Sequence, residues 1–282
     1  MTSVKELKSV DLASYTIIAT AIAVLFSIIS SIVLVIGMGM VSLDAVGSSI
    51  YLVSTIIFGT LMYATYNSFC QGFLYNLLAK KFNTINIAIK DDKEITKVST
   101  TQTAIIVSMI MTIQVIILYL VSVFLLPLLL NSIIQTLMFS GQEVLAYALY
   151  QFLMLMSQPI IIAMVIFGTF IITFVFVLLG CYIYNMLANT GRGAIVNFSK
   201  EDDFTAIDSI DVVKFTIVFG IVVGVLNLIS VILTIASGTI YSALISIIVG
   251  FVGAFVNGAL IAIFYNFLAP KLGKLKLELI DQ

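Results

Sequence analysis

Three Tyr-Asn pairs are the residues of this sequence whose type and spacing could do chemistry. Tyr75-Asn76, Tyr184-Asn185 and Tyr265-Asn266 each end a long apolar run, and an Ala stands three positions after each Asn. If the three Asn side chains converge, their amides could form a polar gate or bind a ligand. Alternatively, each Asn bonds the backbone of the turn or of a neighbouring strand and fixes that junction. We favour the second interpretation, because the Asn recurs together with the junction, and we expect each Tyr in the aromatic belt at the headgroup level.

Little else in the sequence suggests catalysis or metal binding. The chain has no His, which is the commonest metal ligand and the usual general base near neutral pH. It shows no recognisable nucleophile motif and no Gly-rich phosphate loop. Cys70 and Cys181 could be a redox pair or half of a metal site, but we favour small apolar packing inside a helix bundle. We therefore expect a protein that is not an enzyme and uses no metal or cofactor.

The composition indicates a membrane protein. Apolar residues make up 61% of the chain, charged residues only 10%, and the mean hydropathy is +1.21. Soluble domains contain about 25% charged residues, and a helix that crosses a bilayer needs about 20 apolar residues. The sequence therefore predicts an α-helical membrane protein with six transmembrane helices, at about 15–36, 49–79, 104–126, 160–188, 212–236 and 243–269.

Short β-strands are predicted between the helices. Counted from each Tyr, positions +10, +12 and +14 are apolar in all three copies: Ile85, Ile87, Ile89, Ala194, Val196, Phe198, Leu275, Leu277 and Leu279. This period of two predicts a strand. Further strands are expected within 1–11, near 95–98 and at 204–210. We expect the six strands to pair into one small sheet or barrel-like cap, since an isolated hairpin is marginal in water; two separate hairpins on the lipid surface are the alternative.

The helices that follow the first strand of each copy begin in similar ways. Asp11 and Asp211 each follow an apolar residue and precede an apolar run, and Ser99 stands at the corresponding place in the middle copy. Asp or Ser at this position accepts a hydrogen bond from the first turn, and Asp is also favoured by the helix dipole. We expect all three residues to be N-caps.

Together these patterns predict three tandem β-α-α-β repeats, at 1–90, 94–199 and 204–282. The middle repeat carries an insertion at 127–157, where Pro127 and several polar residues interrupt the apolar pattern. We expect an interfacial or re-entrant helix there. In the loop after the first helix, Gly37, Gly39 and Asp44 predict a break, and Pro270 is expected to stop the last helix.

The basic residues predict the orientation. All 13 Lys and Arg residues fall in the segments on one side of the six-helix arrangement. The positive-inside rule then places both termini and both β-hairpins in the cytoplasm. The net charge of −1 gives no reason to expect nucleic-acid binding.

Small residues in the last two helices predict close helix packing. Gly220 and Gly224 lie four apart in one helix, and Gly250 and Gly258 lie in the other with Ala254 between them. Such small-xxx-small patterns let helix backbones approach one another. Asn227 and Asn257 could bond across this contact.

The paired motifs resemble a family of small actinobacterial and archaeal membrane proteins that is classed as a transmembrane domain of unknown function. That family has Ile-Asp-x-x-Ser-x-x-Lys before a first helix, and Tyr-Asn-x-x-Ala, Gly-Gly and an alternating strand after a later one. Ile210-Asp211 with Lys214 and the stretch 265–279 match best. The Gly-Gly is replaced by Asn83-Thr84, Arg192-Gly193 and Gly273-Lys274. The resemblance implies this architecture and a prokaryotic plasma membrane, and no activity.

Two classes of function agree with these observations. The first is a non-catalytic scaffold or anchor in the lipid bilayer whose cytoplasmic β-cap docks a protein partner, with the acidic turns at 91–92 and 201–203 as candidate contacts. The second is a channel or permease for a small neutral solute, lined by Ser, Thr, Asn and Gln. The near absence of charges within the helices weakens a proton-coupled mechanism. We favour the scaffold; the oligomeric state is not predicted.

Overall fold

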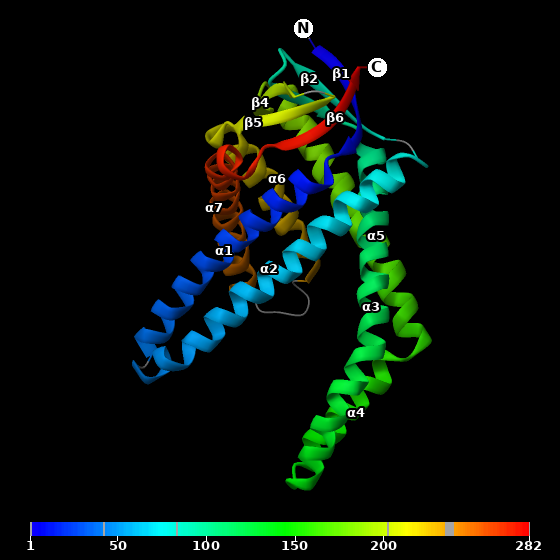
Figure 1. Cartoon of the computed structure of the whole chain (residues 1–282), viewed down its shortest axis with the longest axis vertical. Coiled ribbons are helices and arrows are strands. Elements are labelled where there is room, and N and C mark those ends of the chain that lie inside the picture. Colours follow the sequence, from blue (N-terminus) through cyan, green and yellow to red (C-terminus); the bar gives the residue numbers. More distant parts are fainter. Residues whose placement is uncertain (1, 42, 83, 202, 235–239, 282) are drawn as a thin grey trace. The chain divides into compact units, whose positions relative to one another are not determined.

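Among the residues that the computed structural model describes, six helices are long and apolar enough to cross a membrane, so the chain has the character of a multi-pass membrane protein. The structure describes residues 2–41, 43–82, 84–201, 203–234 and 240–281. Asn83, at a Gly-Gly position of the repeats, and Asp202, in an acidic turn, therefore lie outside the described residues. In chain order the elements are β1 (Thr2–Val10), α1 (Leu12–Val41), α2 (Leu43–Ala79), β2 (Ile85–Lys90), β3 (Glu94–Val98), α3 (Thr100–Phe139), α4 (Glu143–Met156), α5 (Pro159–Asn189), β4 (Ala194–Glu201), β5 (Phe204–Ile210), α6 (Val212–Thr234), α7 (Ile240–Leu272) and β6 (Leu275–Asp281) (Figure 1).

Several helices run further than the sequence predicted. α1 continues through Gly37 and Gly39 to Val41, so the prediction that these glycines lie in a loop was wrong. A Gly in a helix costs about 1 kcal/mol relative to Ala. An unpaired backbone group in lipid costs several kcal/mol, so an apolar chain there keeps its helix.

Pro127 and Pro270 also lie inside helices. α3 continues through Pro127 to Phe139, so the predicted end of the third transmembrane helix near residue 126 was wrong. α7 likewise passes Pro270 and ends at Leu272. Gly273, with φ +106°, follows and donates its amide to the carbonyl of Ala269 at 3.2 Å. Proline removes one backbone hydrogen bond, and the neighbouring bonds of a long apolar helix can hold the remainder in place.

The chain divides into two compact units. The first comprises residues 1–103 and 178–282, and the second comprises Ala104–Val177. The second unit contains most of α3, all of α4 and the first part of α5. Within it, the Tyr119 hydroxyl donates a hydrogen bond to the carbonyl oxygen of Met156. Residues 127–139 of the predicted insertion continue α3, and the separate helix α4 occupies most of the rest.

The six strands of the described residues all belong to the first unit and form one closed barrel. Each strand pairs with its neighbours in sequence order, and β6 pairs with β1 to complete the circle. Every pairing is antiparallel. Figure 1 shows β1 and β6 side by side, with both ends of the chain at the same end of the barrel. The strands therefore form a single barrel rather than two separate hairpins.

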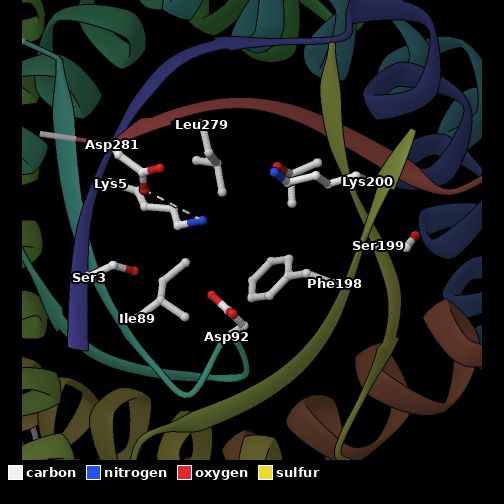
Figure 2. A pocket seen from close by; sticks show the side chains of 10 residues that line it. Ser3, Lys5, Ile89, Asp92, Phe198, Ser199, Lys200, Leu279 and Asp281 are labelled. Carbon is white, nitrogen blue, oxygen red and sulfur yellow. Dashed lines mark ion pairs between the residues drawn. The ribbon is translucent and has the colours of Figure 1, made fainter. Parts of the chain in front are cut away.

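The barrel interior is apolar. Ile89, Phe198 and Leu279 project into the ring (Figure 2). Because side chains of a strand alternate between its two faces, the other apolar residues of the three period-two patterns lie on the same inner face. Of these, Ala194, Val196 and Ile89 are buried. A small barrel of this kind is filled by its own side chains. The period-two pattern in the sequence thus corresponds to the inner surface of the barrel.

The helices of the first unit pack as α1 against α2 and α6 against α7, and α1 also contacts α7. Ile18 of α1 is buried together with Tyr265, Leu268 and Ala269 of α7. Because α7 also contacts β5, this apolar cluster continues from the helices to the base of the barrel. Tyr265, the first residue of the Tyr-Asn pair of α7, lies within it.

Candidate functional site

Each of the three Asn side chains holds both backbone groups of one strand residue. Asn76 accepts the amide of Val10 and donates to its carbonyl oxygen, both at 2.8 Å. Asn266 does the same to Ile210, again at 2.8 Å in both bonds. Asn185 accepts the amide of Val98 at 2.8 Å and donates to its carbonyl at 2.9 Å. The strand residue held is in each case the last of an odd-numbered strand.

The preceding Tyr binds the same strand three residues earlier. The hydroxyls of Tyr75, Tyr184 and Tyr265 donate to the carbonyl oxygens of Leu7, Ile95 and Ile207 at 2.5, 2.6 and 2.5 Å. Two of these hydroxyls also accept an amide from the first residue of the next strand, Ala194 at 3.4 Å and Leu275 at 3.2 Å. We call each Tyr-Asn pair with its strand partners a Tyr-Asn clamp.

The clamps use the polar atoms of both residues for the fold. Tyr75 is 7% exposed and Tyr265 3% exposed, and the Ala that ends each motif is buried. The hydroxyls of all three Tyr residues reach strand carbonyls, and the place of the rings in an aromatic belt stays a prediction. A Tyr ring beside an apolar cluster finds a partner for its hydroxyl, and the strand end provides that partner.

Asp11 and Asp211 cap the helices that follow the clamped strands. The backbone amide of Ser14 donates to the Asp11 carboxylate at 2.8 Å, and the backbone amide of Lys214 donates to the Asp211 carboxylate at the same distance. This is the bond from the third helical residue to the N-cap side chain. The corresponding Ser99 differs, since its hydroxyl accepts the amide of Asn86 at 3.0 Å. Asp11 and Asp211 thus act where they were expected, while Ser99 joins β2 to the start of α3.

The predicted glycines lie at the α6–α7 contact. A Cβ atom at Gly220 would come within 2.5 Å of the Phe255 ring, and one at Gly224 within 2.6 Å of the Phe251 ring. One at Gly250 would lie 1.8 Å from Asn227 Nδ2, and one at Gly258 would lie 3.0 Å from the Phe219 ring. Asn227 donates to the carbonyl of Ser246 across this contact at 3.3 Å, whereas Asn257 is exposed. The aromatic rings of one helix thus sit on the glycines of the other.

The barrel mouth is a cavity of about 420 Å³ at the end of the barrel remote from the clamps. Its apolar wall is formed by Ile89, Phe198 and Leu279. Its polar residues are Ser3, Lys5, Asp92, Ser199, Lys200, Thr205 and Asp281. Figure 2 shows the side chains of Lys5, Asp92 and Lys200 directed into the ring from three different parts of the barrel. The cavity falls within the size range of ordinary small-molecule sites.

Only part of the charge in the mouth is paired. Lys5 Nζ lies 3.7 Å from a carboxylate oxygen of Asp281. The Lys5 side chain is 19% exposed and that of Asp281 is 78% exposed. Within the described part of the chain, no ion pair of the barrel includes Lys200 or Asp92. The mouth therefore offers groups of both signs to a ligand.

A separate charge network lies on the strands β4, β5 and β6. Lys274 Nζ contacts Glu201 at 2.9 Å and Asp208 at 2.8 Å, and Lys276 contacts Glu201 at 3.0 Å. Hydrogen bonds from Lys274 lower the pKa of both carboxyl groups below their usual values. The same contacts, with Asp208 first, raise the pKa of Lys274 above its usual value. Every charge in this network is satisfied by a neighbour, so it serves to hold strands together.

The barrel mouth was not predicted from the sequence, although a signal for it exists. At position +16 from each Tyr, the alternating apolar pattern ends on a charged residue, namely Asp91, Lys200 or Asp281. Extending the period of two by one step would have placed Lys200 and Asp281 on the inner face of the barrel. Lys5 stands two residues before Leu7 in β1, so the same period of two places both side chains on one face of that strand. Cys70 and Cys181, in contrast, are free thiols in α2 and α5 and do not line this cavity.

A scan against protein-family models found no match, and searches among curated proteins and solved structures found none either. The resemblance to the transmembrane family of unknown function therefore stays a prediction. The clamps and the barrel mouth are the features of the molecule from which a function can be inferred.

Proposed function

We propose that the protein is a non-catalytic membrane anchor, built from three β-α-α-β repeats, that presents its barrel to a protein partner in the cytoplasm. The observation that carries this proposal is the threefold recurrence of the Tyr-Asn clamp. Asn76, Asn185 and Asn266 each tie the end of one helix to a strand 56 to 87 residues away. Three such ties hold the barrel firmly on the helix ends, which is what a docking platform requires.

The repeat proposal is supported by the order of the barrel. β1 and β2, β3 and β4, and β5 and β6 each enclose one pair of long apolar helices, and each pair of strands is hydrogen bonded. β2 and β3 are joined by the turn at 91–93, and β4 pairs directly with β5. Each repeat has exposed strand edges, and these edges are paired with strands of the neighbouring repeats. Three copies are thus sufficient to close a barrel without an exposed edge.

The basic residues support a cytoplasmic barrel. Lys5, Lys8, Lys274 and Lys276 lie on or beside β1 and β6. Lys214 lies in the first turn of α6 and Lys271 in the last turn of α7, and the other Lys and Arg residues lie outside the candidate membrane spans. Under the positive-inside rule, this side of the membrane is the cytoplasm. Because the family that the sequence resembles is prokaryotic, we place the chain in a prokaryotic plasma membrane.

In-cell photo-crosslinking tests the anchor function. Benzoylphenylalanine would replace Thr205 at the barrel mouth, and as a matched control Ser140 in the turn between α3 and α4. We expect one discrete protein adduct from position 205 that is absent from position 140 and is lost when Lys200 is also changed to Glu. Adducts of equal pattern from both positions, or none at 205 in a folded protein, would contradict the proposal.

A channel or permease for a small neutral solute is the second candidate, and one observation favours it. The hydroxyls of Thr20 and Ser31 are buried in α1 without a hydrogen-bond partner. Buried polar groups in a membrane helix often mark a solute path. The apolar filling of the barrel opposes this function, because a polar solute would have to pass it. Flux of a neutral solute through liposomes that contain the protein, abolished by Thr20→Val, would favour the channel.

A further inference from the structure

The barrel mouth combines an apolar wall with an equal number of positive and negative side chains. Lys5 and Lys200 supply the positive charges, and Asp92 and Asp281 the negative ones. We propose that this mouth binds a small zwitterion with an apolar body, the chemistry of a free amino acid or a dipeptide. The proposal stands independently of whether a protein partner docks on the barrel.

The balance of charge selects this class of ligand. A phosphate or other anion would be favoured by a surplus of Lys and Arg, and a metal ion by a surplus of carboxylates. In the mouth, neither sign is in surplus. A ligand with one group of each sign can satisfy Lys200 and Asp92, whereas a ligand with a single charge would leave one of them unpaired. Lys200 and Asp92 are both exposed, so each added ion pair contributes modestly, and a zwitterion gains two such pairs where a singly charged ligand gains one.

The apolar wall requires that the ligand also carries an apolar part. Phe198 and Leu279 project into the same space as the charged groups (Figure 2). Burial of an apolar side chain against them adds binding free energy in proportion to the area removed from water. A small polar zwitterion such as glycine therefore lacks one of the two components that the cavity offers.

The position of Lys5 strengthens the electrostatic part. Its ammonium group lies inside the ring and is largely shielded from water, and its distance of 3.7 Å from Asp281 is long for an ion pair. A carboxylate placed between Lys5 and Lys200 would accept hydrogen bonds from both ammonium groups. The ligand's ammonium group would then face Asp92 on the opposite side of the mouth, with Asp281 at its exposed edge.

Equilibrium dialysis of the purified full chain in nanodiscs tests the proposal. The ligand series is radiolabelled phenylalanine, the dipeptide Leu-Phe, phenylalaninamide, which lacks the carboxylate, and N-acetylphenylalanine, which lacks the ammonium group. We expect saturable binding of phenylalanine or Leu-Phe, and affinity weaker by about two- to fivefold for the two ligands with one charge, because most of the charged groups of the mouth are exposed. Raising the salt concentration is expected to weaken binding, because the mouth is open to solvent.

Substitutions in the mouth assign each charge to its partner. Lys200→Gln should abolish the preference for phenylalanine over phenylalaninamide, and Asp92→Asn should abolish the preference over N-acetylphenylalanine. Lys97→Gln and Asp203→Asn are matched controls, since both residues are exposed and neither lines the mouth. Both controls should bind like the unaltered protein.

Two results would overturn the proposal. One is the absence of saturable binding of both phenylalanine and Leu-Phe to protein that unfolds cooperatively on heating. The other is equal binding of all four ligands, which would mean that the charges take no part. Neither result affects the photo-crosslinking experiment, so the anchor function and the ligand site can fail separately.

Discussion

Asn76 forms two hydrogen bonds with the backbone of Val10, one with its amide and one with its carbonyl, both at 2.8 Å. A neighbouring strand would make the same two bonds in an antiparallel ladder. The amide side chain of Asn, which has one acceptor and two donors, therefore substitutes for a peptide group where the ladder ends. Asp could not donate, and an apolar residue could do neither. This explains why Asn stands at this position in all three clamps.

Replacement of Asn266 is expected to destabilise the protein. Asn266→Asp keeps the size of the side chain but loses the donor to the Ile210 carbonyl, and Asn266→Leu loses both bonds. Each unpaired backbone group costs about 1–3 kcal/mol, so the Leu variant should unfold at the lower temperature. Thermal unfolding of the detergent-solubilised chain measures both, with the exposed Asn131→Asp as control. Equal unfolding temperatures for all three variants would show that the clamp contributes nothing.

Gly220→Ala and Gly250→Ala are expected to weaken the α6–α7 contact. The added methyl groups would lie 2.5 Å from the Phe255 ring and 1.8 Å from Asn227 Nδ2, so the helices would have to move apart. Overpacking of this kind costs about 1–3 kcal/mol. Gly253→Ala on the same helix as Gly250 meets nothing within 4 Å and serves as the control. Thermal unfolding should separate the three variants, with Gly253→Ala equal to or slightly more stable than the unaltered chain.

The strands could be predicted from the sequence because their inner faces have a strict period of two. Ile85, Ala194 and Leu275 each begin such a pattern at the same distance from a Tyr. The closure of the barrel could not be predicted, because it depends on the pairing of β1 with β6, which lie at opposite ends of the chain. It also depends on bulges, such as the one between Leu7 and Ser9, that shift the register by one residue. No local pattern encodes these shifts.

The helix boundaries and the candidate sites could also be predicted only in part from the sequence. Gly37, Pro127 and Pro270 predict breaks in water, but an apolar helix passes through them, since lipid offers no partner for an exposed backbone group. The Asn of each clamp was recognised from its recurrence. Its partner on the strand could not be identified, because that residue lies 56 to 87 positions earlier in the chain, beyond a pair of long helices. The barrel mouth was missed because its charged residues come from different strands and a turn.

Lys274→Met is expected to lower the stability at neutral pH and to have no effect in strong acid. Lys274 lowers the pKa of Glu201 and Asp208 below their ordinary values of 4.5 and 3.8. A carboxyl group with a depressed pKa in the folded state contributes stability that is present above its unfolded pKa and is lost as the pH falls through its folded pKa. The difference in unfolding temperature between the two proteins should therefore be constant above about pH 5. This difference in unfolding temperature should disappear once the pH falls below the lowered pKa values of Glu201 and Asp208.

The unfolding temperatures of the same two proteins at alkaline pH provide a second test of this prediction. The pKa of Lys274 is raised above its ordinary value of 10.5. Its contribution is then fully present below that value and is lost only as the pH rises through the higher folded pKa. Lys97→Met, on an exposed side chain with no such network, is the control. A difference that persists unchanged into acid would show that Lys274 acts by packing rather than by charge.

Labelling of single cysteines tests the orientation of the barrel. In a chain with Cys70 and Cys181 changed to Ala, Asp203→Cys places a thiol on the turn between β4 and β5, and Ser140→Cys places one between α3 and α4. A membrane-impermeant maleimide should label position 140 but not 203 in intact cells, and position 203 in inside-out vesicles. The reverse pattern would put the barrel outside the cell and would remove the cytoplasmic partner from the proposed function.

Closure of the barrel predicts a disulfide between the first and last strands. Glu6 and Ile280 are direct partners in the β1–β6 pairing, and opposed residues of antiparallel strands have Cα atoms about 4.5–5.5 Å apart, which is within the range of a disulfide. In the background without native cysteines, Glu6→Cys with Ile280→Cys should cross-link on oxidation. After cleavage at a protease site inserted between α3 and α4, the two fragments should then stay together until a reductant is added. Glu6→Cys with Leu279→Cys is the matched control, because neighbouring residues of a strand point to opposite faces. Equal cross-linking of both pairs would contradict the β1–β6 register, since only one of the two pairs can be directly opposed.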